Sequence, residues 1–79
     1  MSKQSAYFAV PGLTGRHTVK MVKQVLGGIP GVLSVSADVR GDRVAVDYDS
    51  TGTAPEKIAE QFRSAGLGAE LLENRDHTM

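Results

Sequence analysis

The stretch from Ala9 to Val32, AVPGLTGRHTVKMVKQVLGGIPGV, constrains the fold of this chain more than any other segment. Hydrophobic residues recur in it at intervals of three and four, which places them on one face of a helix. These residues are Val19, Val22, Leu26 and Ile29. Thr14 is a suitable N-cap, and Gly27-Gly28 followed by Pro30-Gly31 ends the helix and turns the chain. The stretch therefore predicts the end of a strand, a glycine-containing loop, one amphipathic helix and a turn.

Alternating hydrophobic and polar residues predict strands on both sides of this helix. The expected strands are Ser5–Val10, Val32–Val39, Val44–Asp49 and Ala69–Glu73. A second helix carries its apolar stripe on Ile58, Phe62 and Ala65, and Gly66 is a natural residue to end it. Thr53-Ala54-Pro55-Glu56 fits a capping box at the start of that helix.

The resulting order, βαββαβ with one hairpin in the middle, is that of an α+β ferredoxin-like fold. In this fold two helices cover one face of a four-stranded antiparallel sheet. We expect a disordered N-terminus at residues 1–4, one domain at residues 5–73 and a flexible tail at residues 74–79. The predicted core consists of Phe8, Val22, Leu26, Val35, Val46, Ile58 and Phe62.

Composition excludes several classes of function. Nine basic residues balance nine acidic ones, so no overall charge attracts nucleic acid or an anionic membrane. The longest apolar runs are only a few residues, too short for a membrane span or a signal-peptide core, and we expect a cytoplasmic location. The chain has no cysteine, which removes disulfides, thiolate catalysis and thiolate metal ligands together.

The segment that opens the first helix resembles the heavy-metal-associated (HMA) domain of copper chaperones and metal-pumping ATPases. The pattern of that family is G-M-x-C-x-x-C, an apolar helix and then P-G-V. Here Gly12-Leu13-Thr14 stands at its start and Pro30-Gly31-Val32 at its end, but Gly15 and Thr18 occupy the two cysteine positions. The resemblance spans roughly residues 7–72 and implies a ferredoxin-like fold and a role in metal transport. In metal-binding relatives a Tyr, Lys or Phe overhangs the metal site, whereas Leu67 has that position here.

The degenerate C-x-x-C pattern bears directly on metal binding. Glycine offers no ligand and a threonine hydroxyl suits a soft ion such as Cu(I) poorly, so no cofactor is expected to bind with high affinity. His17 is the candidate metal ligand, with Met21 one turn further on, but a single imidazole makes only a weak transition-metal site. The loop from Gly12 to Thr18, with Arg16 inside it, can alternatively bind an anion through free backbone N–H groups.

A basic stripe, formed by Arg16, Lys20 and Lys23, follows the solvent side of the first helix. It is either a solvated face or a docking surface for a protein partner with an acidic surface. The aspartates of the strands are candidates for a hard-cation site or a solvated sheet face; they are Asp38, Asp47 and Asp49. Tyr7 is the one aromatic residue expected on the open sheet face, which is fewer than the two or three that an RNA-binding sheet offers for stacking.

No motif joins serine, histidine and acidic residues into a catalytic set, so we do not expect an enzyme. The sequence predicts a small non-enzymatic protein similar to a copper chaperone, with weak or lost metal binding. The alternative is a protein-interaction or anion-binding module that uses the loop at residues 12–18 and the basic stripe.

Overall fold

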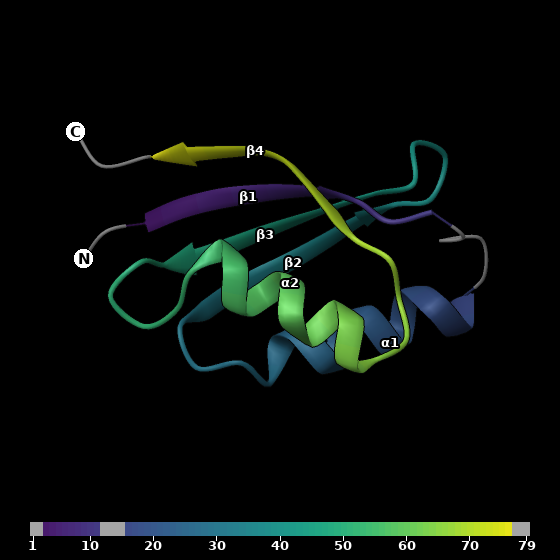
Figure 1. Cartoon of the computed structure of the whole chain (residues 1–79), viewed down its shortest axis with the longest axis horizontal. Coiled ribbons are helices and arrows are strands. Elements are labelled where there is room, and N and C mark those ends of the chain that lie inside the picture. The colour runs from purple at the N-terminus through teal and green to yellow at the C-terminus, as the bar shows by residue number, and fades with distance from the viewer. Residues whose placement is uncertain (1–2, 12–15, 77–79) are drawn as a thin grey trace.

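The computed structural model describes residues 3–11 and 16–76, with the side chains of residues 16, 17 and 76 left out. Its elements, in chain order, are β1 (Lys3–Ala9), α1 (Arg16–Gly27), β2 (Val32–Asp38), β3 (Arg43–Asp49), α2 (Pro55–Ser64) and β4 (Glu70–Asp76). This is the predicted βαββαβ order, and the ferredoxin-like fold is confirmed (Figure 1). No helix in the described ranges is long and apolar enough to cross a membrane.

The four strands form one antiparallel sheet in the order β2-β3-β1-β4. Figure 1 shows both helices on the same side of this sheet, so the other side is open. The β1 and β3 strands are central, while β2 and β4 form the two edges. Buried and partly exposed positions alternate in β3 from Val44 onward and in β1 from Ala6 onward, because each strand has one face against the helices and one face open.

The core lies between the helices and the central strands. Its fully buried large side chains are Phe8, Val10, Val22, Leu26, Val44, Val46, Tyr48, Ile58 and Phe62. The rings of Phe8 and Phe62 meet at 5.2 Å between centroids with a 52° tilt, which joins β1 to α2. All seven predicted core residues belong to this cluster, six of them buried and Val35 partly buried against it.

The end of α2 follows the glycine signal in the sequence. Gly66 has φ +80°, and its N–H donates to the carbonyl of Arg63 over 2.9 Å. The Leu67 N–H donates to the carbonyl of Phe62 over 2.9 Å, which completes a Schellman motif. This motif turns the chain toward β4 and packs the half-buried Leu67 against the core.

The start of α2 differs from the predicted capping box. Ala54 is the N-cap and makes no side-chain cap hydrogen bond, while Pro55 is the first helical residue. Thr53 lies one residue before the cap, with 5% of its surface exposed and no described hydrogen-bond partner for its Oγ1 atom. The Thr53 side chain is therefore buried in the packing instead of capping the helix.

The first and last strands of the chain, β1 and β4, have different bounds from those expected from the sequence, and each is longer. The strand expected at residues 5–10 is β1 at residues 3–9, and the strand expected at residues 69–73 is β4 at residues 70–76. A polar cluster joins the extensions: Tyr48 Oη donates to Asn74 Oδ1 at 2.7 Å, and Asn74 Nδ2 donates to Gln4 Oε1 at 2.8 Å. Residues 3–4 and 74–76, expected in flexible ends, thus pair across the sheet; residues 1–2 and 77–79 lie outside the described part.

Candidate functional site

The loop at residues 12–18, which stands where the family has its metal-binding motif, is only partly described. Gly12, Leu13, Thr14 and Gly15 lie outside the described residues. Arg16 and His17 form the first turn of α1, but their side chains are not described, so the predicted ligand role of His17 stays a prediction. Thr18, at the second cysteine position of the pattern, is half-buried on the same turn.

The described part of the basic stripe faces solvent. Lys20 and Lys23 are exposed on α1, while Val22 and Leu26 of the same helix are buried in the core. This division follows from the helical spacing of the apolar residues. Neither lysine makes an ion pair with another described residue. Met21 lies between them in sequence with 37% of its surface exposed, so the described side chains of α1 present two cations and one thioether to solvent.

The three aspartates proposed for a hard cation have structural roles at three separate places. Asp47 accepts hydrogen bonds from the hydroxyls of Ser5 and Ser34 on the open face of the sheet. Asp38 accepts from the Arg40 and Gly41 N–H groups of the β2–β3 turn. Asp49 accepts from the backbone and hydroxyl of Thr51 in the loop before α2. No group of three or more His, Asp or Glu side chains suited to a metal ion occurs within residues 3–11 and 16–76.

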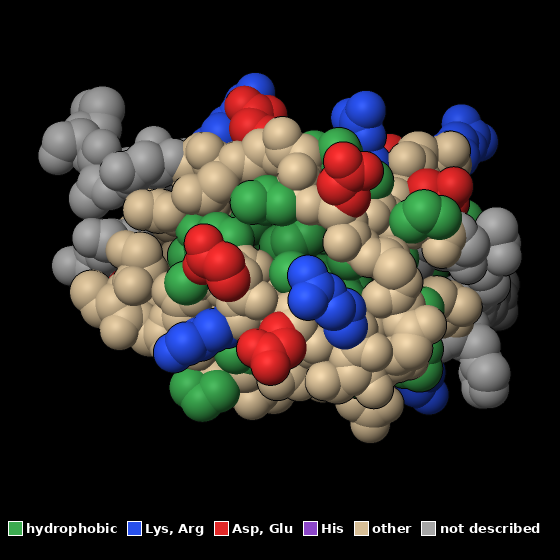
Figure 2. All heavy atoms as spheres, in the orientation of Figure 1, with side chains coloured by type: hydrophobic (Ala, Val, Ile, Leu, Met, Phe, Trp, Pro, Cys, Tyr) green, Lys and Arg blue, Asp and Glu red, His purple; other side chains and the backbone are tan. Residues whose placement is uncertain are grey.

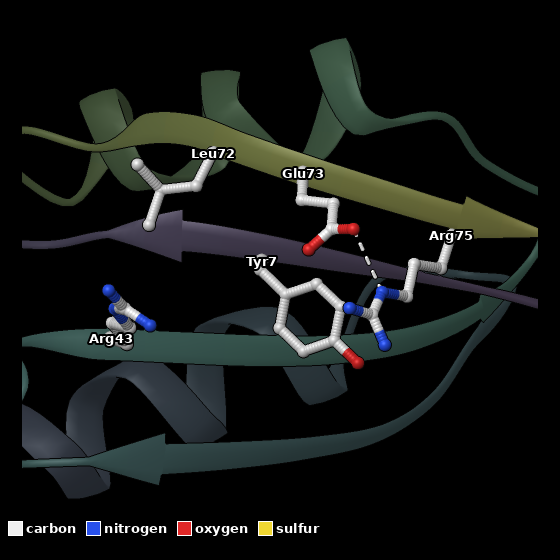
Figure 3. Close-up of a pocket in the computed structure, with 5 residues that line it drawn as sticks. All are labelled: Tyr7, Arg43, Leu72, Glu73 and Arg75. Carbon is white, nitrogen blue, oxygen red and sulfur yellow. Dashed lines mark hydrogen bonds and ion pairs between the residues drawn. The ribbon is translucent and has the colours of Figure 1, made fainter.

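A hollow on the open face of the sheet was not expected from the sequence. Its volume is about 690 Å³, and it is lined by Tyr7, Arg43, Leu72, Glu73 and Arg75. Figure 3 shows Tyr7 between the two arginines, with Arg75 donating to Glu73 Oε1 from Nε at 2.8 Å. The Arg75 guanidinium also lies 5.8 Å from the centroid of the Tyr7 ring. Hydrogen bonding and Coulombic attraction from Glu73 raise the pKa of Arg75 above its ordinary value.

The hollow depends on a β-bulge in the pairing of β1 with β4. The register shifts between Tyr7 and Phe8, where Tyr7 pairs with Glu73 and Phe8 with Leu71. Leu72 is the extra residue, and the bulge places it on the open face beside Glu73. No local signal in the sequence marks this bulge, so the sequence did not indicate that Leu72 and Glu73 lie beside Tyr7.

Comparisons with known proteins support the ferredoxin-like fold and the family resemblance seen in the sequence. The model of the heavy-metal-associated domain family matches residues 7–67. The copper chaperone CopZ of Enterococcus hirae is 25% identical over 82% of this chain and 94% of its own length.

Two solved structures share the fold. The copper-binding domain of HMA7, a P-type ATPase, has a TM-score of 0.83 and 27% identity, covering 99% of this chain and 100% of its own. Oxidized MerP of Ralstonia metallidurans CH34 has a TM-score of 0.84 and 22% identity over 90% of this chain and 99% of its own, which shows the fold alone. Since the family match spans most of the chain and the fold agrees, the protein belongs to the heavy-metal-associated domain family.

Proposed function

We propose that this protein is a non-enzymatic member of the heavy-metal-associated family that acts in metal traffic without a thiolate copper site. The observation that carries the proposal is the absence of cysteine from the whole sequence, with Gly15 and Thr18 at the two ligand positions of the family pattern. A soft cation such as Cu(I) prefers thiolate or thioether sulfur, and a threonine hydroxyl replaces neither.

The other potential ligands near α1 support only weak binding. His17 offers one imidazole, and Met21 offers one partly exposed thioether a turn away. Zinc and copper sites normally need three or four ligands in fixed geometry. The relatives include a copper chaperone and a copper-binding domain of an ATPase. Copper is therefore the metal whose affinity for this protein should be measured first.

Competition with a Cu(I) chelator tests the proposal. Purified protein is titrated with Cu(I) in the presence of bathocuproine disulfonate under anaerobic conditions, and the coloured chelator complex is followed. We expect the chelator to take all of the metal. Retention of a stoichiometric Cu(I) ion by the protein would contradict the proposal and would indicate a sulfur or imidazole site built by other residues.

A second candidate function is docking of a protein partner by α1. It is favoured by the exposed Met21 and by Lys20 and Lys23, which make no ion pair with another described residue. Exposed charges of this kind mainly raise the rate of association with an oppositely charged surface, so the partner would present carboxylates. The anion-binding alternative at residues 12–18 is distinguished by NMR: phosphate should shift only amides at the start of α1, whereas a protein partner should shift the whole exposed face of the helix.

The cytoplasmic location stays a prediction from the sequence.

A further inference from the structure

A groove between α2 and β4 leaves apolar surface uncovered on the helix side of the sheet. Its volume is about 530 Å³, and its lining residues are Pro55, Glu56, Ala59, Glu60, Arg63, Ala69, Glu70 and Leu71. Leu71 pairs with the fully buried Phe8, yet 44% of Leu71 is exposed. Figure 2 shows hydrophobic side chains at the bottom of this hollow, between α2 and β4. The helix α2 therefore covers the centre of the sheet and leaves its β4 edge open.

The rim of the groove is acidic. Glu56 and Glu60 project from α2 and Glu70 from the start of β4, and Arg63 is the one cation among the lining residues. These four side chains make no ion pair with another described residue. An apolar floor beneath three unpaired carboxylates and one guanidinium fits an occupant with an apolar side chain flanked by basic ones.

The position of β4 indicates an extended occupant. β4 is an edge strand, so one side of its backbone has no strand among the described residues to pair with. Leu72, next to Leu71, is 48% exposed and lines the hollow on the opposite face of the sheet. A helix laid in the groove would contact Leu71 and leave Leu72 exposed. A strand added to the edge would place side chains on both faces and contact both leucines.

We propose that β4 accepts an extended segment of a partner protein as a fifth strand of the sheet. The segment carries apolar residues at its centre and lysine or arginine on either side, so that apolar side chains contact Leu71 and Leu72. The cations lie near Glu56, Glu60 and Glu70. Backbone hydrogen bonds to the strand edge supply affinity, and the groove supplies specificity.

A second copy of this chain is a poorer occupant of the same edge. The β4 sequence has three acidic residues, Glu70, Glu73 and Asp76, against one basic residue, Arg75. Pairing two such strands side by side places an excess of carboxylates together, which is unfavourable. The proposal concerns a different surface from the exposed lysines of α1, so it stands or fails separately from the proposed function.

The probe is a capped peptide, Lys-Thr-Lys-Val-Val-Lys-Thr-Lys, titrated into isotopically labelled protein and followed by NMR. Its two valines face opposite sides of a strand, and each side also carries lysines. We expect binding with a Kd of about 0.1–1 mM, the range in which a short strand with few anchors falls. Amide shifts should centre on β4 and on the exposed side of α2, and β4 amides should gain protection from hydrogen exchange.

Two altered peptides separate strand addition from charge attraction. A peptide with glutamate in place of every lysine should bind at least about tenfold more weakly, because it meets the same carboxylates. A peptide N-methylated at alternate residues, on the edge facing β4, keeps its charge but loses the backbone hydrogen bonds, and it should not bind measurably. Equal binding of the methylated and unmodified peptides would overturn strand addition.

Protein variants locate the site. Glu56→Lys with Glu60→Lys should weaken binding about tenfold, as should Leu71→Ser with Leu72→Ser, which removes the apolar contacts without adding charge. Leu33→Ser is the matched control, because Leu33 is 50% exposed on the opposite edge strand β2 and its replacement should leave binding unchanged. Peptide shifts centred on β2 or α1 would contradict the proposal. So would concentration-dependent shifts on β4 without peptide, which would assign the edge to self-association.

Discussion

At the scale of single residues, Gly31 shows how the Pro-Gly-Val turn of the family fixes the connection between α1 and β2. Gly31 has φ +96°, and its carbonyl accepts a hydrogen bond from the N–H of Asp49 over 2.7 Å. A Cβ atom at this position would lie 2.9 Å from the carbonyl carbon of Gly52, a contact with backbone that cannot rotate away. Two loops from opposite halves of the sequence therefore touch through two glycines.

Replacement of Gly31 by alanine should destabilise the protein more than the same change at Gly66. Both positions have positive φ, which costs a side chain about 1–2 kcal/mol. At Gly66 an added Cβ meets nothing within 4 Å, so only that conformational cost applies. Gly31→Ala should add the cost of separating the two loops, and chemical denaturation of both variants gives the comparison. Equal losses of unfolding free energy would show that the contact with Gly52 relaxes freely.

The buried hydroxyl of Thr53 leads to a second prediction about stability. Its hydroxyl is buried without a described partner, so Thr53→Val, which keeps the shape, should raise the free energy of unfolding by about 1 kcal/mol. Thr53→Ser keeps the hydroxyl and removes the methyl group, and it should lower the free energy of unfolding. Urea titrations of the three proteins decide the matter; a valine variant as unstable as the serine variant would reveal a hydrogen bond to Oγ1.

At the scale of elements, the packing of α2 on the sheet rests on Ile58 and Phe62. Phe62 has 1% of its surface exposed and contacts the ring of Phe8. Phe62→Ala should therefore cost about 3–5 kcal/mol, a large share of the stability of so small a domain. Arg63→Ala, one residue further on and exposed, is the control and should change the melting temperature little. An unchanged melting temperature for Phe62→Ala would show that α2 does not hold the core together.

The elements also show what the sequence could predict. Apolar periodicity gave the order of elements and the core, because burial on one face imposes a regular spacing. The predicted ends of β1 and β4 were wrong, because they depend on contacts between residues that are far apart in the sequence. Tyr48 of β3 hydrogen-bonds to Gln4 and to Asn74, and no local sequence pattern marks these contacts. The β4 bulge, and with it the placement of Leu72 and Glu73 beside Tyr7, depends on pairing with β1 and leaves no local trace. Both candidate surfaces on β4 were therefore missed.

At the scale of the whole molecule, the net charge is zero, but basic and acidic side chains gather on two different surfaces. Lys20 and Lys23 lie exposed on α1, while Glu56, Glu60 and Glu70 surround the groove at β4. If α1 docks an acidic partner, Lys20→Glu with Lys23→Glu should slow association at low salt and leave the fold intact. The matched control is Glu56→Lys with Glu60→Lys, which should not slow it. Stopped-flow rates unaffected by the lysine changes would leave α1 as a solvated face.

The family scaffold as a whole is tested by restoring its ligands. Gly15→Cys with Thr18→Cys should create a soft-metal site, because the two positions are three residues apart in an otherwise matching sequence segment and Thr18 lies in the first turn of α1. Free N–H groups and the helix dipole lower the pKa of thiols at a helix N-terminus and favour the thiolate. Binding should be weaker than in a copper chaperone, since Leu67 packs against the core and offers neither a polar nor an aromatic group to the metal. Cu(I) titration of the double variant beside both single variants, with circular dichroism to check the fold, measures the effect. A folded double variant no better than either single one would mean that the likeness to the family ends at the fold and does not include the geometry of the loop.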